Sequence, residues 1–287
     1  MLIFASYQQL YLTMRKLTIL VFLTLICGVA NSQNIYSALQ LNQEREYKTR
    51  RPKKIVETNI FFNESGKQVD KNEKTFDAAG MLLIEERFDE TGKIKARLSY
   101  NNDTVKRIIQ SRTFERWNQF GSSKETAFYS YNSNNYLVGI ADKDSNGNIL
   151  CESTLICNDK GHPIQISLFD RNGYLYGIEK AIYLYDRNKC ITSVISNDGS
   201  ILSTDTITIS YKNAYLIPSA RERYNANGDE VSWTRQNQNG TEILMEEEYI
   251  YDEYGNCTEN KIYEITIKTN GKQKKEIDRI FKKEYIY

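Results

Sequence analysis

The chain has 287 residues, 40% of them hydrophobic and 26% charged, so it is long enough to bury a sizeable core. Its formal net charge of +1 excludes a general electrostatic attraction to nucleic acid or to an anionic membrane. Tyrosine is unusually frequent, with 21 residues against three prolines, which favours β-strands whose ends stay in contact with water.

Residues 1–32 are predicted to be an export signal and not part of the fold. A basic segment after Met14 is followed by an apolar stretch from Leu17 to Ile26, too short to cross a bilayer. Small residues then lead up to Gln33, as signal peptidase requires. Met14 is therefore the predicted start, and the chain is expected in the periplasm, on the outer-membrane surface or secreted. No transmembrane segment is expected after cleavage.

Residues 33–56 show no turn period and are predicted to be a linker or flank. Residues 57–287 repeat one pattern and are predicted to form a single β-repeat domain. The pattern is an aromatic residue, a turn with Asp or Asn and then Gly, and an alternating run; Asp or Asn opens such a turn and Gly supplies its positive φ. The residues that define it are Phe76, Asp77, Gly80, Phe88, Asp89, Gly92, Phe169, Asp170, Gly173, Tyr224, Gly228, Tyr251, Asp252, Gly255 and Asn256.

The runs between these turns alternate between polar and apolar residues. In the run 93–100, Ile94, Ala96, Leu98 and Tyr100 share one face, which is the two-residue period of a half-buried strand. Turns at intervals of about 12 to 16 residues predict an all-β antiparallel meander of about 13 sequential strands. A sheet of that size is expected to curl or to fold into two layers.

The period breaks once in the middle of the chain and its composition changes at the end. Residues 115–131 break the rhythm of the repeat and are predicted to be a long loop or a seam between two sub-sheets. The segment 268–287 has seven Lys or Arg residues against three acidic ones. Charges on a terminal strand discourage pairing with another sheet, so we expect an edge strand here and a monomeric protein.

The stretch Tyr251–Asn256, with the sequence YDEYGN, resembles the YD repeat of the Rhs-type family. The segment from Tyr249 to Tyr287 resembles the C-terminal repeat of small secreted YD-repeat proteins of Bacteroidetes. In those proteins Gly-Asn is commonly followed by Trp, where this chain has Cys257. The resemblance implies a β-hairpin repeat scaffold and an association with carbohydrate or the cell surface. Such repeats serve as scaffolds for unrelated activities.

Few residues could support catalysis. The single histidine, His162, lies in a predicted turn and is expected to be solvated. The sequence has no nucleophile elbow, phosphate-binding loop, dinucleotide fingerprint or Cys-x-x-Cys pair, so no cofactor or metal is predicted and the chain is predicted to be non-enzymatic. Carboxylate pairs can still be assembled in space, and Glu246, Glu247 and Glu248 are candidates for a glycoside-acting enzyme.

Four cysteines follow the predicted signal: Cys151, Cys157, Cys190 and Cys257. An even number in an exported chain permits two disulfides. We favour free thiols at packing positions, because Cys157 and Cys257 stand where other copies of the pattern have an aromatic residue.

Exposed aromatic residues are the predicted ligand contacts. Trp117, Trp233 and Tyr254 could stack on sugar rings, and the alternative is that the tryptophans fill the core. The sequence thus favours an exported, non-enzymatic scaffold or binding protein that engages a glycan or an envelope protein, with no nucleic-acid partner. The alternatives are a toxin-related repeat or immunity component and a glycoside-acting enzyme.

Overall fold

The computed structural model describes residues 33–42, 50–63, 66–209, 222–236, 242–267 and 273–287. The predicted export signal lies outside these residues. The described chain is almost entirely antiparallel β-structure, with one short helix and one 3₁₀ turn. The elements are α2 (Ile35–Asn42), β1 (Lys54–Asn63), β2 (Gly66–Phe76), β3 (Leu82–Phe88), β4 (Ile94–Asp103), β5 (Ile108–Asn118), β6 (Gly121–Tyr131), β7 (Leu137–Asp144), β8 (Ile149–Cys157), β9 (Pro163–Asp170), β10 (Leu175–Leu184), η1 (Tyr185–Arg187), β11 (Lys189–Ile195), β12 (Ile201–Thr208), β13 (Arg223–Tyr224), β14 (Glu230–Gln236), β15 (Glu242–Tyr251), β16 (Cys257–Ile267) and β17 (Gln273–Ile286).

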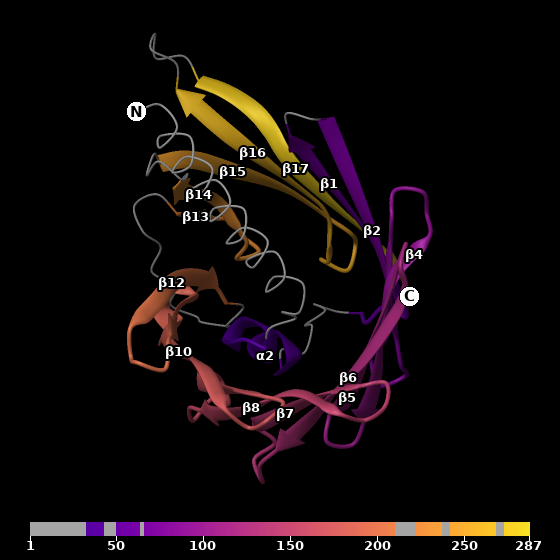
Figure 1. Ribbon diagram of the computed structural model, residues 1–287. Coiled ribbons are helices and arrows are strands. Elements are labelled where there is room, and N and C mark those ends of the chain that lie inside the picture. The colour runs from indigo at the N-terminus through magenta and orange to yellow at the C-terminus, as the bar shows by residue number, and fades with distance from the viewer. Residues whose placement is uncertain (1–32, 43–49, 64–65, 210–221, 237–241, 268–272) are drawn as a thin grey trace, which may run out of the picture.

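The strands form one 17-stranded sheet in which pairing follows chain order almost throughout. β1 pairs with β2 on one side and with β17 on the other, so the first and last strands are neighbours. The ladder therefore runs from β13 to β17, continues through β1, and ends at β12. The ribbon curls round α2, which brings β12 back toward β13 and β14 (Figure 1). The predicted all-β meander is confirmed, in its curled form.

The stretch predicted to be a loop or a seam is instead a regular hairpin, β5–β6. Its tight turn runs from Asn118 to Gly121, where the Asn118 side chain accepts the backbone N–H of Phe120 at 2.8 Å. The turn does follow the pattern of the other copies, with Trp117, Asn118 and Gly121, so the prediction of a loop or seam was wrong. The described residues form 17 strands, where about 13 were predicted.

The repeated turns have the geometry that their residue types predict. The Gly255 N–H donates to the Asp252 carbonyl at 3.0 Å, and Gly255 has a φ of +80°. The Asp252 carboxylate accepts the backbone N–H groups of Tyr254 and Asn256, at 2.9 and 2.8 Å. In the copy where Asn replaces Gly, Asn135 adopts a φ of +60°. An Asp or Asn followed three residues later by a residue with positive φ therefore specifies these turns.

A second repeated feature, which the sequence analysis missed, is a pair of tyrosines two residues apart at a strand end. The Tyr251 hydroxyl donates to the Asp229 carboxylate and accepts a hydrogen bond from the Asn225 amide at 2.7 Å. These two bonds tie Tyr251 to the turn 225–229. Tyr249, stacked on Tyr251 at a centroid distance of 6.2 Å, places its hydroxyl 3.0 Å from a backbone carbonyl just after that turn.

The same arrangement recurs in two other places along the sheet. The Tyr287 hydroxyl lies 2.5 Å from the Asp252 carboxylate and accepts the Asn256 amide at 2.8 Å. The Tyr185 hydroxyl accepts the Asn158 amide at 2.8 Å. Because successive turns of a meander alternate between its two ends, all these contacts lie at one end. We call it the tyrosine end, formed by the turns 77–81, 132–136, 158–162, 225–229 and 252–256.

The main core lies between α2 and the concave face of the sheet. Ile35, Ala38 and Leu39 of the helix are at most 1% exposed and pack against a cluster from β6–β11. The N–H of Ile35 donates to the Glu179 carboxylate at 2.7 Å, and the Gln33 amide donates to Asp142 at 2.6 Å. Residues 33–42, predicted to be part of a linker, thus form a docked helix. Its apolar spacing is helical but too short to be distinctive without the surface that receives it.

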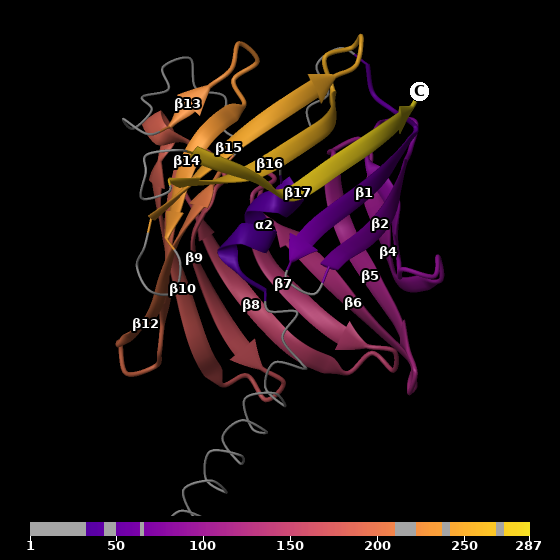
Figure 2. The same ribbon diagram turned by 90° about the horizontal axis from the view of Figure 1, so that it is seen from above.

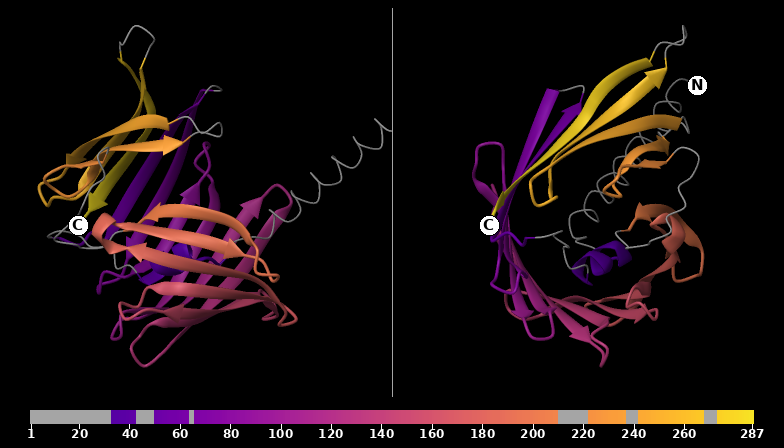
Figure 3. Two further views of the ribbon diagram at one scale, coloured as in Figure 1. Left: turned by 90° about the vertical axis from the view of Figure 1, so that its left-hand side faces the viewer. Right: turned by 180° about the vertical axis from the view of Figure 1, so that it is seen from behind.

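The last strand is not an edge, contrary to the prediction from its charges. β17 pairs with β16 and with β1, and its end lies beside the N-terminal hairpins (Figure 3). Its lysines instead face acids on neighbouring strands: Lys282 lies 3.0 Å from Glu259 and Lys275 lies 2.8 Å from Glu248. The positive charge of this segment is neutralised within the sheet.

Candidate functional site

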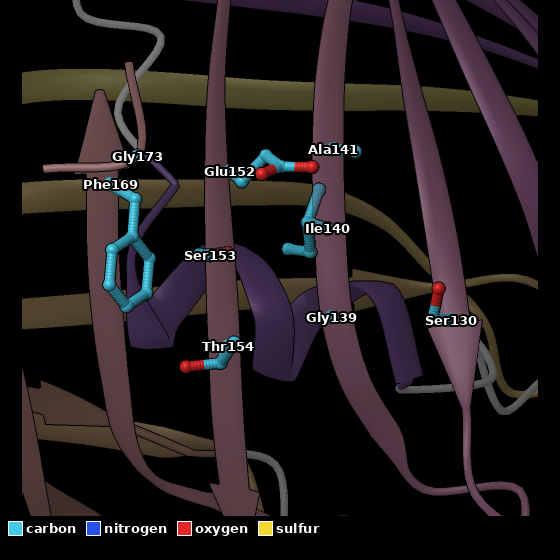
Figure 4. Close-up of a pocket in the computed structure, with 9 residues that line it drawn as sticks. All are labelled: Ser130, Gly139, Ile140, Ala141, Glu152, Ser153, Thr154, Phe169 and Gly173. Carbon is cyan, nitrogen blue, oxygen red and sulfur yellow. The ribbon is translucent and has the colours of Figure 1, made fainter. Parts of the chain in front are cut away.

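An open groove of about 360 Å³ lies on the sheet over β6–β9. α2 lies behind these strands when the groove faces the viewer, so the groove is on the convex face (Figure 4). Its lining comes from four neighbouring strands and one turn, and consists of Ser130, Gly139, Ile140, Ala141, Glu152, Ser153, Thr154, Phe169 and Gly173.

Small residues on β7 form the floor of the groove. The register places Gly139 between Ser130 of β6 and Thr154 of β8, and a Cβ added at Gly139 would meet the Ser130 Cβ at 3.5 Å. Ala141, two residues further on and on the same face, is paired with Glu152. Because Gly139 has no side chain and that of Ala141 is a single methyl group, the surface above this part of β7 forms a hollow.

The walls combine one aromatic ring with hydrogen-bonding groups. Phe169 is paired with Glu152 across β8 and β9, and Glu152 and Thr154 are both exposed. In Figure 4 the Glu152 carboxylate extends toward Ala141, and the Phe169 ring and the Thr154 hydroxyl lie on the other side of β8. No Lys, Arg or His lines the groove. An apolar wall together with a carboxylate and hydroxyls suits a neutral ligand that has both an apolar face and hydroxyl groups.

The three aromatic residues predicted to bind ligand lie apart from this groove and from one another. Trp117, on β5, is 38% exposed, with the Arg97 guanidinium 5.8 Å from its ring centre. Trp233, on β14, is half-buried and donates its indole N–H to Glu247 at 2.6 Å. Tyr254 lies at the tyrosine end in the turn after β15. In the sheet, β14 and β5 are separated by seven strands, β15–β17 followed by β1–β4. The structure therefore does not assemble these residues into one site.

Arginines of the segment predicted to be a linker secure the tyrosine end. Arg50 donates to the Tyr254 hydroxyl at 3.0 Å and lies 4.9 Å from the centre of the Tyr287 ring. Arg51 donates to the carbonyl of Ala79 at 2.8 Å. Their role in the structure is to hold the first strand against two turns.

The three glutamates proposed as a catalytic alternative are engaged by neighbouring side chains. Glu247 accepts hydrogen bonds from Tyr249 at 2.6 Å and Asn260 at 2.7 Å, in addition to the indole of Trp233. Glu246 and Glu248 both lie within 3.3 Å of the Lys275 ammonium. These contacts link adjacent strands and give the acids a structural role.

His162 is half-buried and not solvated, contrary to expectation. Its Nδ1 lies 2.9 Å from the Tyr185 hydroxyl, and burial lowers the pKa of the ring. The four cysteines are free thiols. Cys190 is fully buried in the main core, and the Cys157 thiol donates to the Leu137 carbonyl at 3.2 Å. Within the part of the chain that the structure describes, no three His, Cys, Asp or Glu side chains could hold a metal ion.

No protein-family model and no curated protein sequence matches the chain. Among solved structures, a porin-like protein from Bacteroides uniformis is similar with 12% identity and a TM-score of 0.48, over 84% of this chain and all of that one. A porin-like protein from Bacteroides vulgatus shares 10% identity over 82% of this chain and 98% of that one, with a TM-score of 0.32. A chain of the TcdB2–TccC3–Cdc42 structure shares 10% identity with a TM-score of 0.23. The match covers 77% of this chain but 16% of that one.

Likenesses this distant carry no argument about function, so the function is inferred from the residues of this chain. Among the described residues, no helix is long and apolar enough to span a membrane.

Proposed function

We propose that the chain is an exported, non-enzymatic binding protein on a YD-repeat-like β-scaffold, and that the convex groove binds a glycan. The observation that carries the proposal is that Phe169 and Glu152, at paired positions of neighbouring strands, line a groove whose floor is opened by Gly139 and Ala141. A sugar ring offers C–H groups to an aromatic wall and hydroxyls to polar groups, which is the combination that this lining provides.

The charge of the groove indicates which glycans it selects. Glu152 is the only ionisable residue among the lining side chains. An acidic sugar would bring a second negative charge next to this carboxylate without a cation to offset it. We therefore expect neutral sugars to bind and uronic or sialic acids to be rejected. One carboxylate also falls short of the pair that glycoside hydrolysis normally requires, which supports a binding role.

The test is a glycan array followed by titration calorimetry on the chain from Gln33 onward. We expect a neutral glycan to bind, and Phe169→Ala to weaken that binding by up to about tenfold, since an aromatic contact contributes about 0.5–1.5 kcal/mol. Glu152→Gln, at an exposed position, tests the polar contact with little risk to folding.

Trp117→Ala is the matched control, because it removes an exposed aromatic residue outside the groove. Circular dichroism would verify that each variant is folded. The proposal is wrong if no glycan binds, or if binding depends on Trp117 and not on Phe169 and Glu152.

A further inference from the structure

Three consecutive hairpins carry exposed apolar pairs at the end of the sheet opposite the tyrosine end. The pairs follow the turns after β7, β9 and β11 and recur 26 residues apart. Their exposed fractions range from 36% for Leu175 to 67% for Ile201. We call these residues the apolar rim: Ile149, Leu150, Leu175, Tyr176, Ile201 and Leu202.

A β-bulge after each turn produces these pairs. The register shifts where β7 meets β8, where β9 meets β10 and where β11 meets β12, so each of Leu150, Tyr176 and Leu202 is an extra residue without a partner across the ladder. A bulge disturbs the strict alternation of side chains between the two faces. Two successive apolar residues therefore become exposed at the same place in each hairpin.

Bulges at the tyrosine end have a different outcome. The pair after the β8–β9 turn is Pro163 and Ile164, of which Ile164 is the extra residue and is 37% exposed. Pro163 is buried and its carbonyl accepts the Tyr183 hydroxyl at 2.8 Å, so only one residue of this pair is exposed. The rim is therefore not a necessary result of the repeat. Further exposed aromatic residues lie at the same end as the rim: Tyr174 is 72% exposed and Phe120, on the neighbouring β5–β6 hairpin, is 90% exposed.

We propose that the apolar rim docks the protein on the surface of a zwitterionic phospholipid bilayer. Adjacent hairpins stand about 10 Å apart, so the rim extends over roughly 20 Å and is too long for one small ligand. Its residues belong to three separate hairpins, β7–β8, β9–β10 and β11–β12, and a fluid lipid surface can accommodate each hairpin end (the ribbon is seen in Figure 2). Aliphatic side chains with tyrosines beside them are the composition that partitions into the membrane interface.

The position of the N-terminal segment provides independent support for a bilayer as the partner. Gln33 is bonded to Asp142, two residues before β7 ends at the rim. The apolar stretch of the predicted export signal ends at Ile26, seven residues earlier, and seven residues span at most about 25 Å. While the signal is held in a membrane, the rim is therefore at the end of β7 nearer to that membrane, two residues from Asp142 compared with five for Leu137 at the other end.

The turns beside the rim determine the lipid type. Hydrogen bonds within their own turns lower the pKa of three carboxyls: Asp144 accepts the Asn148 side chain, Asp198 accepts the Ser196 hydroxyl, and Asp170 accepts the backbone N–H of Tyr174. The three carboxylates therefore remain negatively charged at neutral pH, and the turns need no bound cation to stabilise them. Arg171, in the turn of Asp170, offsets only part of this negative charge, so anionic headgroups are disfavoured and apolar insertion provides the binding.

The test is flotation of the chain from Gln33 onward, which contains every described residue, with phosphatidylcholine vesicles that carry no glycan. The variant Leu150→Ser/Tyr176→Ser/Leu202→Ser changes one residue in each hairpin and is expected to reduce the partition coefficient at least tenfold. Val105→Ser/Ile182→Ser is the matched control, because these residues are 92% and 65% exposed away from the rim. This control variant should bind the phosphatidylcholine vesicles as strongly as the unchanged chain does.

A second measurement does not require removing the rim. Tyr176→Trp is expected to show fluorescence quenching by brominated phosphatidylcholine, and Val105→Trp at the opposite end is not. The proposal is overturned if the chain does not float, if it binds anionic vesicles alone, or if both tryptophan positions are quenched equally. Because the vesicles carry no sugar, these outcomes are independent of glycan binding.

Discussion

Tyrosine hydroxyls join turns that the backbone alone would leave independent. Tyr251 bonds to two side chains of the turn 225–229, which lies one hairpin earlier in the chain. Burial, followed by the hydrogen bond to Asp229, raises the pKa of Tyr251 to about 12. The phenol therefore stays protonated at neutral pH and can donate to the carboxylate. This contact explains why an aromatic residue with a hydroxyl precedes the turn at the most complete copy of the repeat.

Tyr251→Phe tests this contact, since it removes the hydroxyl and keeps the ring. We expect the free energy of unfolding to fall by about 1–3 kcal/mol, because the Asp229 carboxylate loses a part-buried partner. Urea denaturation measures the change. Tyr174→Phe, at a position that is 72% exposed, is the control and should leave stability within about 0.5 kcal/mol. Equal stability of both variants would show that the hydroxyl has no structural role.

At the level of elements, α2 and the preceding Gln33 are bonded to two acidic residues of the sheet, the buried Glu179 and the half-buried Asp142. Glu179 accepts the first N–H of the helix, and burial raises the pKa of its carboxyl. Burial likewise raises the pKa of Asp142, which accepts the Gln33 amide. A carboxyl with a raised pKa in the folded state contributes most stability below its unfolded value, near 4.5 for Glu179, and loses it as the pH rises through the folded value.

Glu179→Gln tests this dependence, because it removes the charge and keeps an oxygen that can accept the helix N–H. We expect the variant to be more stable than the unchanged chain at pH 8 and to lose that advantage near pH 4, where Glu179 is protonated. Thermal unfolding at both pH values measures the difference. An advantage that is the same at pH 4 and pH 8 would mean that the charge of Glu179 is not the cause.

At the scale of the whole molecule, the curl is held where the ends of the sheet approach each other. The Lys189 ammonium, on β11, lies 3.5 Å from Glu222 and 3.8 Å from Glu230, beside β13 and in β14. It also donates to Thr208 of β12 at 3.2 Å. Burial raises the pKa of Glu230, and the charge of Lys189 opposes that shift. Lys189 therefore links the two edges of the sheet across its opening.

Lys189→Met tests this link by keeping the length of the side chain and removing the charge. We expect the free energy of unfolding to fall by up to about 3 kcal/mol, the lower end of the range for a buried charge left without its partner. Adding Glu230→Gln should restore part of the loss, since it removes one uncompensated charge. If the double variant is less stable than the sum of its single changes, electrostatic pairing is not what joins the edges.

The all-β class, most of the strands and most of the turns could be predicted from the sequence, because these depend on residues within a few positions of each other. Asp252 and Gly255 specify a reversal without help from the rest of the chain. The groove could not be predicted from Gly139 and Ala141, because the role of a glycine in a strand depends on the residues that lie next to it in the sheet.

The tertiary structure alone decided what these strands enclose. β1 meets β17, α2 enters the concave face, and Phe169 stands beside Glu152 through pairings that local periodicity does not specify. The predicted sugar contacts Trp117 and Trp233 were chosen by residue type, and the order of the strands places them far apart in the sheet. A groove or a docked helix depends on which surfaces the curl brings together, and that is a property of the whole sheet and not of any one repeat.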